Sequence, residues 1–163
     1  MKLLITGSRS WDTYDPHGRK VAEVILRLNP SHVACGDAGG ADRAVATVLP
    51  TTNCTRLSVY KADWNHFGKG AGFIRNWFML SDFEPDEVVA FWDGRSSGTR
   101  HMMNLAFEVG KPVTWFQPKR PPSGPGLVHS WFHEYAMEEP HLVPGRALPS
   151  YQEIEQRTLG IFE

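Results

Sequence analysis

Short apolar runs alternate with amphipathic segments over residues 1–117 of the chain. Most runs end at glycine, proline or aspartate, which is typical of a buried strand that leads into a turn. These runs predict strands at Lys2–Thr6, Ser31–Cys35, Thr55–Tyr60, Val88–Trp92 and Pro112–Phe116.

The segments between the runs carry apolar residues at the spacing of one helix face. Asp15-Pro16 suits a helix cap and first turn, and Val21, Val24, Ile25 and Leu28 follow at helical spacing. Later helices are predicted after the second, third and fourth strands, the third strand's helix running from about Gly72 to Leu80. Their inner faces are predicted to hold Ala41, Ala44, Val45 and Val48, then Ile74, Trp77 and Phe78, then Thr99, Met102, Met103 and Ala106.

Strands that alternate with helices favour parallel pairing through right-handed crossovers. We therefore predict an α/β fold: a Rossmann-like, doubly wound, mainly parallel five-stranded sheet with a short helical C-terminal extension. Residues 1–117 would form this domain, and residues 118–163 a linker and a helical appendage packed on it. Pro118–Gly126 predicts the linker, and Leu127–Met137 and Ser150–Arg157 predict helices.

The composition is that of an ordinary soluble globular protein, with 41% hydrophobic and 21% charged residues among 163. Because 17 lysines and arginines stand against 18 acidic residues, nucleic acid is an unlikely partner. The first apolar run is too short for a signal peptide or a membrane span. Cys35 and Cys54 show no disulfide spacing, so we expect a cytoplasmic protein without a membrane partner.

Polar, glycine-containing loops follow four of the predicted strands: GSRS, GDAGGAD, ADWNHFGKGAG and DGRSSGT. The carboxyl ends of parallel strands share one edge of the sheet, where such folds bind ligands. Glycine lets the backbone approach a ligand, and the unpaired N–H groups of a helix start attract an anion. The loops therefore predict one site for a phosphate or another anion, although none matches the standard dinucleotide or triphosphate fingerprint.

The candidate ligand-binding residues lie in these loops and at the start of the helix after the third strand. A helix start disfavours a cation, so we predict that Arg75 recognises a phosphate or a carboxylate. Trp11, Trp64 and Trp92 lie near the same loops, where an aromatic ring would cover a nucleobase or pack in the core. The predicted set is Gly7, Ser8, Arg9, Gly36, Asp37, Gly39, Gly40, Asp42, Lys69, Arg75, Asn76, Asp93, Gly94, Ser96, Ser97, Gly98 and Thr99.

Two features are interpreted as structural. Cys35 precedes the second loop, but no motif ties a histidine to it, so we predict a buried side chain and no nucleophile. His129 and His133 have helical spacing without a catalytic glutamate between them, which favours an amphipathic helix over a metal site. We accordingly predict no metal and no resident cofactor.

The motifs ITGSRSW, CGDAGGAD, ADWNHFGKGAGFIRNWFML, AFWDGRSSGT and EVGKPV resemble the YspA-like branch of the SLOG superfamily. This superfamily groups the LOG phosphoribohydrolases, the DprA/Smf proteins and nucleotide-sensing domains of bacterial conflict systems. The resemblance covers residues 2–116 in the same order. It implies a Rossmann-like sheet that binds a nucleotide or a nucleotide-derived ligand, and it implies a homodimer as a common assembly.

The resemblance also bears on catalysis. LOG enzymes cleave the N-glycosidic bond of a nucleoside monophosphate with an arginine in an R-K-x-x-M motif and a glutamate in a P-G-G-x-G-T-x-x-E motif. Here RNWFM carries the arginine role to Arg75, and DGRSSGTRHM carries the phosphate loop to Gly98 and Thr99. The glutamate position holds Met102, which cannot supply a carboxylate.

Asp93 is the best substitute carboxylate in the sequence, with Asp37 and Asp42 behind it. One predicted function is therefore a nucleotide-binding protein, such as a sensor, that works without turnover. The alternative is a hydrolase or transferase that cleaves an N-glycosidic bond of a nucleotide derivative, with Arg75 and Asp93 as catalytic residues. A third function, DNA binding by analogy with DprA, is disfavoured by the balanced charge.

Overall fold

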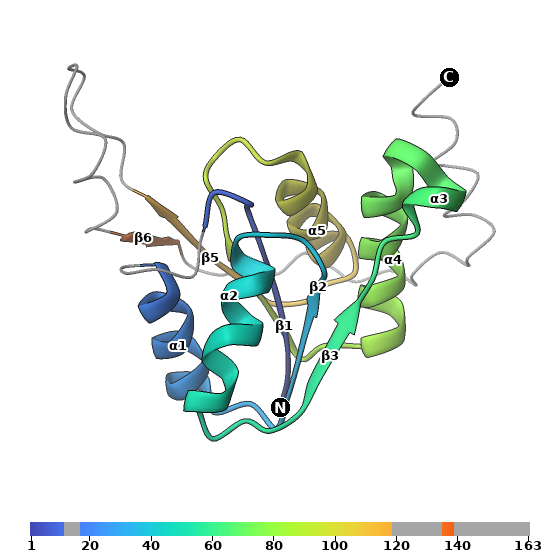
Figure 1. Cartoon of the computed structure of the whole chain (residues 1–163). Coiled ribbons are helices and arrows are strands. Elements are labelled where there is room, and N and C mark those ends of the chain that lie inside the picture. Colours follow the sequence, from blue (N-terminus) through green and yellow to red (C-terminus); the bar gives the residue numbers. More distant parts are fainter. Residues whose placement is uncertain (12–16, 119–134, 139–163) are drawn as a thin grey trace, which may run out of the picture.

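The computed structural model describes residues 1–11, 17–118 and 135–138 (Figure 1). The strands are β1 (Lys2–Gly7), β2 (His32–Gly36), β3 (Leu57–Tyr60), β4 (Glu87–Phe91), β5 (Val113–Pro118) and β6 (Tyr135–Glu138). The helices are α1 (His17–Leu28), α2 (Ala41–Val48), α3 (Trp64–Phe67), α4 (Ala71–Phe83) and α5 (Ser97–Glu108), with short 3-10 turns η1 (Leu49–Thr51) and η2 (Gly68–Gly70).

Five strands form a parallel sheet in the order β3-β2-β1-β4-β5, which confirms the predicted Rossmann-like α/β fold. The chain moves outward from β1 to β3, then returns to the other side of β1 with β4 and β5. The strand order therefore reverses between β1 and β4. This reversal places the loops after β1 and β4 side by side at the carboxyl edge of the sheet.

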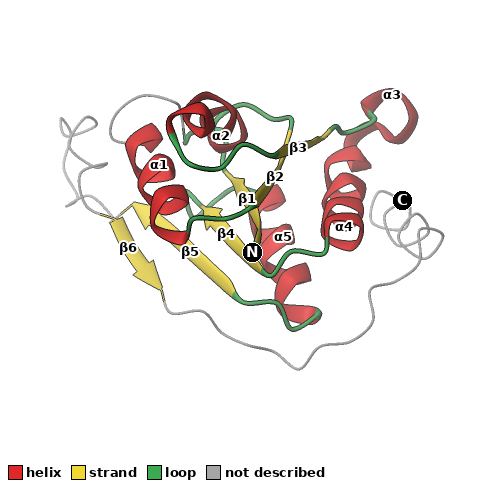
Figure 2. Ribbon diagram, turned by 90° about the horizontal axis from the view of Figure 1, so that it is seen from below, coloured by secondary structure: helices red, strands yellow, loops and turns green. Residues whose placement is uncertain are grey.

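The core lies on both faces of the sheet because neighbouring residues of a strand point in opposite directions. Leu3 and Ile5 of β1 pack in one cluster with residues of α1 and α2. Leu4 packs in a second cluster with residues of α4 and α5. Figures 1 and 2 show the same layers, with α1 and α2 on one face and α4 and α5 on the other.

The sixth strand corrects one prediction. β6 pairs antiparallel with β5, with Met137 opposite Phe116, so the helix predicted over Leu127–Met137 is wrong for residues 135–137. Without β6 the outer edge of β5 would present unpaired N–H and C=O groups, which a strand satisfies and a helix does not. The rest of that predicted helix, the Ser150–Arg157 helix, the Asp15-Pro16 cap and the histidines at 129 and 133 lie outside the described residues.

The predicted inner face of α5 is confirmed, since Thr99, Met102, Met103 and Ala106 are all buried. The predicted face of α4 is partly wrong. Phe78 is 46% exposed, whereas Met79, which lies outside the predicted stripe, is 1% exposed. Because α4 packs against α5 as well as the sheet, its buried face is rotated and widened relative to the simple stripe.

Candidate functional site

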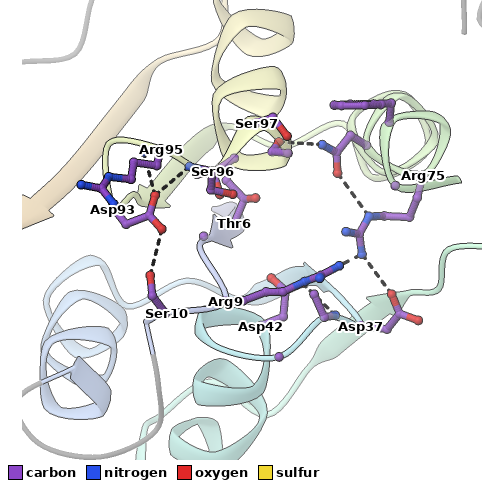
Figure 3. A pocket seen from close by; sticks show the side chains of 18 of the residues that line it. Thr6, Arg9, Ser10, Asp37, Asp42, Arg75, Asp93, Arg95, Ser96 and Ser97 are labelled. Carbon is purple, nitrogen blue, oxygen red and sulfur yellow. Dashed lines mark hydrogen bonds and ion pairs between the residues drawn. The ribbon is translucent and has the colours of Figure 1, made fainter. Parts of the chain in front are cut away.

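A cavity of about 830 Å³ lies at the carboxyl edge of the parallel sheet (Figure 3). Its walls come from the loops after β1, β2 and β4 and from the segment that spans α3 and the first turns of α4. Doubly wound sheets bind ligands at such a reversal of strand order. The predicted residues that line the cavity are Gly7, Arg9, Asp37, Gly39, Asp42, Lys69, Arg75, Asn76, Asp93, Ser96, Ser97, Gly98 and Thr99.

Ser8 does not line the cavity but joins three of its loops. The residue is fully buried. Its N–H donates to the carbonyl of Phe91 at 2.8 Å, and its carbonyl accepts from the N–H of Ala41 at 3.2 Å. Its hydroxyl oxygen accepts from the N–H of Asp93 at 3.0 Å. These bonds hold the loops after β1, β2 and β4 against one another.

Gly36, Gly40 and Gly94 also lie outside the cavity lining and shape its loops. At Gly40 φ is +73°, and a Cβ there would lie 2.2 Å from the carbonyl oxygen of Ser8. At Gly36 a Cβ would lie 1.8 Å from Nη1 of Arg75. Gly94 turns the loop after β4 with a φ of +79°. The loops can approach this closely because these positions carry no side chain.

Asp93 organises the loop after β4. Its Oδ1 accepts from the N–H groups of Arg95 at 2.9 Å and Ser96 at 2.7 Å, and its Oδ2 accepts from the hydroxyl of Ser10 at 2.9 Å. Burial acts to raise the pKa of Asp93, but these hydrogen bonds and that of Ser8 outweigh it and hold the pKa below its usual value. An ionised carboxylate already supplied with donors suits loop support better than proton transfer.

Helix α5 begins at the cavity without a side-chain cap. The N–H groups of its first turn have no carbonyl within the helix to bind, and the helix dipole adds partial positive charge there. The hydroxyl of Thr99 donates to Oγ of Ser96 at 3.1 Å. Ser96 therefore accepts a bond, and no described residue takes its own hydroxyl proton. This helix start is a donor-rich surface.

Three cationic side chains line the cavity, and among the described residues none of them has a carboxylate partner: Arg9, Lys69 and Arg95. Arg9 comes from the loop after β1 and extends into the site in Figure 3. Arg95 follows β4, and Lys69 lies in η2 just before α4. The sequence prediction omitted Arg95, although it lies within the DGRSSGT loop.

Arg75 of α4, by contrast, is held by acceptors of its own chain (Figure 3). Its Nη1 lies 3.2 Å from Oδ1 of Asp37 and 3.9 Å from Oδ2 of Asp42. The same nitrogen donates to the carbonyl of Tyr60 at 3.1 Å, and Nε donates to Oδ1 of Asn76 at 3.2 Å. Arg75 thus recognises two carboxylates of its own chain, and its recognition of a phosphate stays a prediction.

Asp42 differs from Asp93 in its surroundings. It is 5% exposed and accepts from the N–H of Ala38 at 3.1 Å. Burial raises the pKa of Asp42 to about 6, against the opposing effects of Arg75 and the N–H of Ala38. Asp42 therefore exchanges a proton closer to neutral pH than Asp93 does. A carboxyl group with this property in a cavity is a candidate for proton transfer.

Asn76 connects α4 to the start of α5. Its side-chain nitrogen donates to the carbonyl of Gly98 at 3.0 Å and lies 3.3 Å from Nδ1 of His101. Burial lowers the pKa of His101 to about 4, so the ring is neutral near pH 7 and Nδ1 is able to accept that bond. Since the Asn76 carbonyl oxygen holds Arg75, this one side chain orients both the arginine and the helix start.

Of the three tryptophans predicted near these loops, Trp64 lines the cavity, whereas Trp11 and Trp92 do not. Phe73 lines it as well. Trp64 is 49% exposed. Trp11 is 1% exposed and belongs to the core, so core packing rather than a stacking platform is correct for it. Trp92 is half-buried, and its Nε1 donates to the carbonyl of Ser96 at 3.0 Å.

Several lining residues were missed by sequence reasoning. They lie in the predicted loops or beside them, and this position is the one sequence signal that could have identified them. These residues are Thr6, Ser10, Ala38, Gly72, Phe73 and Arg95.

Cys35 is buried, as predicted. Burial, and after it the charge of Asp42, raises the pKa of its thiol to about 12. Within the described part of the chain, no three His, Cys, Asp or Glu side chains are grouped to hold a metal. No helix there has the length and apolar character of a membrane span.

No family model matches the chain. It is similar to the Gene 61 protein of Mycobacterium phage D29, with 36% identity over 124 residues. The match spans 72% of this chain and 98% of the phage protein.

Proposed function

This chain belongs to the same family as the Gene 61 protein of Mycobacterium phage D29, and we propose that its cavity binds a nucleotide or a nucleotide-derived ligand. The phosphate would lie at the start of α5, and the remainder would extend toward α3 and α4. Binding without turnover, as in a sensor, is the activity that the residues favour.

The observation that carries this proposal is the set of unpartnered cations. Among the described residues, Arg9, Lys69 and Arg95 line the cavity, and none of them pairs with a carboxylate. The carboxylates in the walls already have partners of their own, since Arg75 contacts Asp37 and Asp42, and backbone N–H groups donate to Asp93. Arginine side chains and the N–H groups of a helix start both bind phosphate oxygens well.

The size and lining of the cavity favour a nucleotide over free phosphate. A volume of about 830 Å³ falls within the range of small-molecule sites, and a phosphate ion would fill only part of it. Trp64 and Phe73 offer aromatic surface at the α3–α4 side. Aromatic rings stack on nucleobases with little preference for their identity.

The alternative, N-glycosidic cleavage of a nucleotide derivative, has one observation in its favour. Asp42 lines the cavity, and its pKa of about 6 suits a proton donor. Met102 is fully buried and Asp93 is saturated with donors, so neither supplies the reacting carboxylate. Release of free base from nucleoside monophosphates, lost in Asp42→Asn, would establish this activity; the absence of free base would leave binding alone.

A thermal-shift screen with nucleoside mono-, di- and triphosphates tests the binding proposal. A nucleotide at 100 times its Kd should raise the free energy of unfolding by about 2.7 kcal/mol. Arg9→Ala should weaken binding by roughly tenfold or more, since a hydrogen bond to a charged group contributes about 1.5–3 kcal/mol.

Arg43→Ala is the matched control, because Arg43 is an exposed arginine of α2 outside the cavity lining. It removes the same charge and should leave the affinity unchanged. If no nucleotide shifts the melting curve, or if both variants lose affinity equally, the proposed phosphate site is wrong.

A further inference from the structure

The part of the cavity wall formed by Asp37 and Arg75 has a different chemistry from the start of α5. Nη1 of Arg75 is occupied by Asp37, Asp42 and a carbonyl oxygen, and Nε is occupied by Asn76. No described residue accepts from Nη2. Asp37 likewise uses Oδ1, which accepts from Arg75 and from the N–H of Ala62 at 3.3 Å. No described residue donates to Oδ2 of Asp37, and its side chain is 30% exposed in the cavity wall.

This wall is held in place by the fold. The guanidinium of Arg75 lies against the backbone of Gly36, where a Cβ would come within 1.8 Å of Nη1 and 2.5 Å of Oδ2 of Asp42. Gly36 ends β2, and the acceptors come from the loop after β2, the end of β3 and α4. Because these contacts restrain Arg75 and Asp37, the polar atoms of the two side chains that remain without partners keep a fixed direction.

The charges at this wall disfavour a second phosphate. Two carboxyl groups surround one guanidinium, so the local charge is zero or negative, depending on whether Asp42 carries a proton. A phosphate oxygen that approached Oδ2 of Asp37 would meet a like charge and find no donor there. An ammonium group would satisfy Asp37 but offers no acceptor to Nη2 of Arg75. A hydroxyl group both donates and accepts, so of two adjacent hydroxyls one donates to Oδ2 of Asp37 and the other accepts from Nη2 of Arg75.

We infer that the Asp37–Arg75 wall binds sugar hydroxyl groups, so that the cavity selects ribonucleotides over their deoxyribose counterparts. The inference rests on the proposed function, because it assumes that the phosphate lies at the start of α5. It adds the identity of the sugar: an adjacent pair of hydroxyls on one face of the ring gives one group to Asp37 and one to Arg75.

Isothermal titration of the full chain with matched nucleoside 5′-monophosphates tests this inference. Each ribonucleotide is compared with its 2′-deoxy and 2′,3′-dideoxy forms and with the arabinoside, which keeps the number of hydroxyls but inverts the 2′ position. The ribonucleotide should bind at least about tenfold more tightly than the dideoxy form, since a hydroxyl bound to a charged group is lost. The arabinoside should resemble the 2′-deoxy form.

Asp37→Asn locates the effect. The asparagine keeps an acceptor oxygen for Arg75, but at the cavity it replaces the second carboxylate oxygen with an NH2 group, which cannot accept a hydrogen bond. The variant should bind the dideoxy form as the unchanged protein does and lose the preference for ribose. Melting without ligand shows whether it folds, and the sugar series on the unchanged protein stands even if it does not.

Equal affinities for the ribo, deoxy and arabino forms would overturn this inference while leaving the nucleotide site intact. A ribose preference that persists in a folded Asp37→Asn variant would also overturn it. Failure of every nucleotide to bind would instead refute the proposed function, and the sugar assignment with it.

Discussion

Replacing Gly40 by alanine should destabilise the protein because two loops meet at this residue. The φ of Gly40 is +73°, a conformation that costs a non-glycine residue roughly 1–2 kcal/mol. The new Cβ would lie 2.2 Å from the carbonyl oxygen of Ser8 and 2.5 Å from Cα of Arg9. Both contacts are with backbone, so the loop after β1 must shift, which adds about 1–3 kcal/mol. We expect Gly40→Ala to lose roughly 3 kcal/mol of unfolding free energy.

Gly39→Ala is the matched control, since a Cβ at Gly39 would meet nothing within 4 Å. It should be neutral or gain about 0.4–1 kcal/mol through the lower entropy of the unfolded chain. Thermal unfolding of both variants measures the difference, which should reach about 9 °C for a domain of this size. A Gly40→Ala variant that melts within about 2 °C of Gly39→Ala would show that the contact between the loops does not constrain the fold.

Three further variants are to be followed by chemical denaturation over a pH series. Asp93→Asn should lower the free energy of unfolding at pH 7 by about 1–2 kcal/mol; because the folded pKa of Asp93 is depressed, this difference should disappear as the pH falls through that pKa. Asp42 has a folded pKa of about 6, above its ordinary value, so it makes the unchanged protein less stable as the pH rises from about 4 to 6. Asp42→Asn should abolish that slope. His101 has a folded pKa lowered to about 4, so it makes the protein less stable as the pH falls from about 6.5 to 4, and His101→Gln should abolish this opposite slope. A variant that keeps the slope of the unchanged protein would refute the corresponding assignment.

The fold was predictable because its signals are local. Lys2–Thr6 predicted β1 within one residue, and the strand and helix alternation predicted the parallel sheet. β6 was not predictable in this way, because it depends on an open edge of β5 that exists only in the assembled sheet. The exposure of Phe78 has the same kind of cause, since the packing of α5 against α4 decides which face is buried.

The site was predictable in outline because parallel strands bring their carboxyl ends together wherever the loops lie in the sequence. The roles of its residues were less accessible. Ser8 and Gly40 were predicted as ligand contacts, but they join loops and do not line the cavity. Arg75 was recognised as unusual from its place near a helix start, but the sequence did not reveal that Asp37 and Asp42 would meet it. Those contacts join the loop after β2 and the start of α2 to α4, which lies more than 30 residues further along the chain.

Asp93 and Asp42 show most clearly why residue type alone does not assign a role. Asp93 follows a strand directly, which made it the leading candidate in the sequence, yet backbone N–H groups lower its pKa and occupy its oxygens. Asp42 lies on a helix that looks ordinary, yet burial raises its pKa to about 6. The N–H groups that donate to Asp93 belong to the backbone, and every residue except proline has such a group. Their position around Asp93 therefore follows from the folded conformation of the loop and cannot be read from the residue types.

The same distribution of charge would give a bound nucleotide one orientation. In the proposed function, a phosphate would be attracted to the start of α5 and to the unpaired cations of the lining, and the carboxylate of Asp37 would disfavour it at the Asp37–Arg75 wall. Attraction at one end alone would leave a flexible ligand free to turn. Oδ2 of Asp37, to which no described residue donates, would remove that freedom, because a reversed nucleotide would place its phosphate beside a like charge. If the cavity binds a nucleotide as proposed, its orientation would therefore be selected by the pairing of Arg75 with its own carboxylates, which would keep this wall from becoming another anion site.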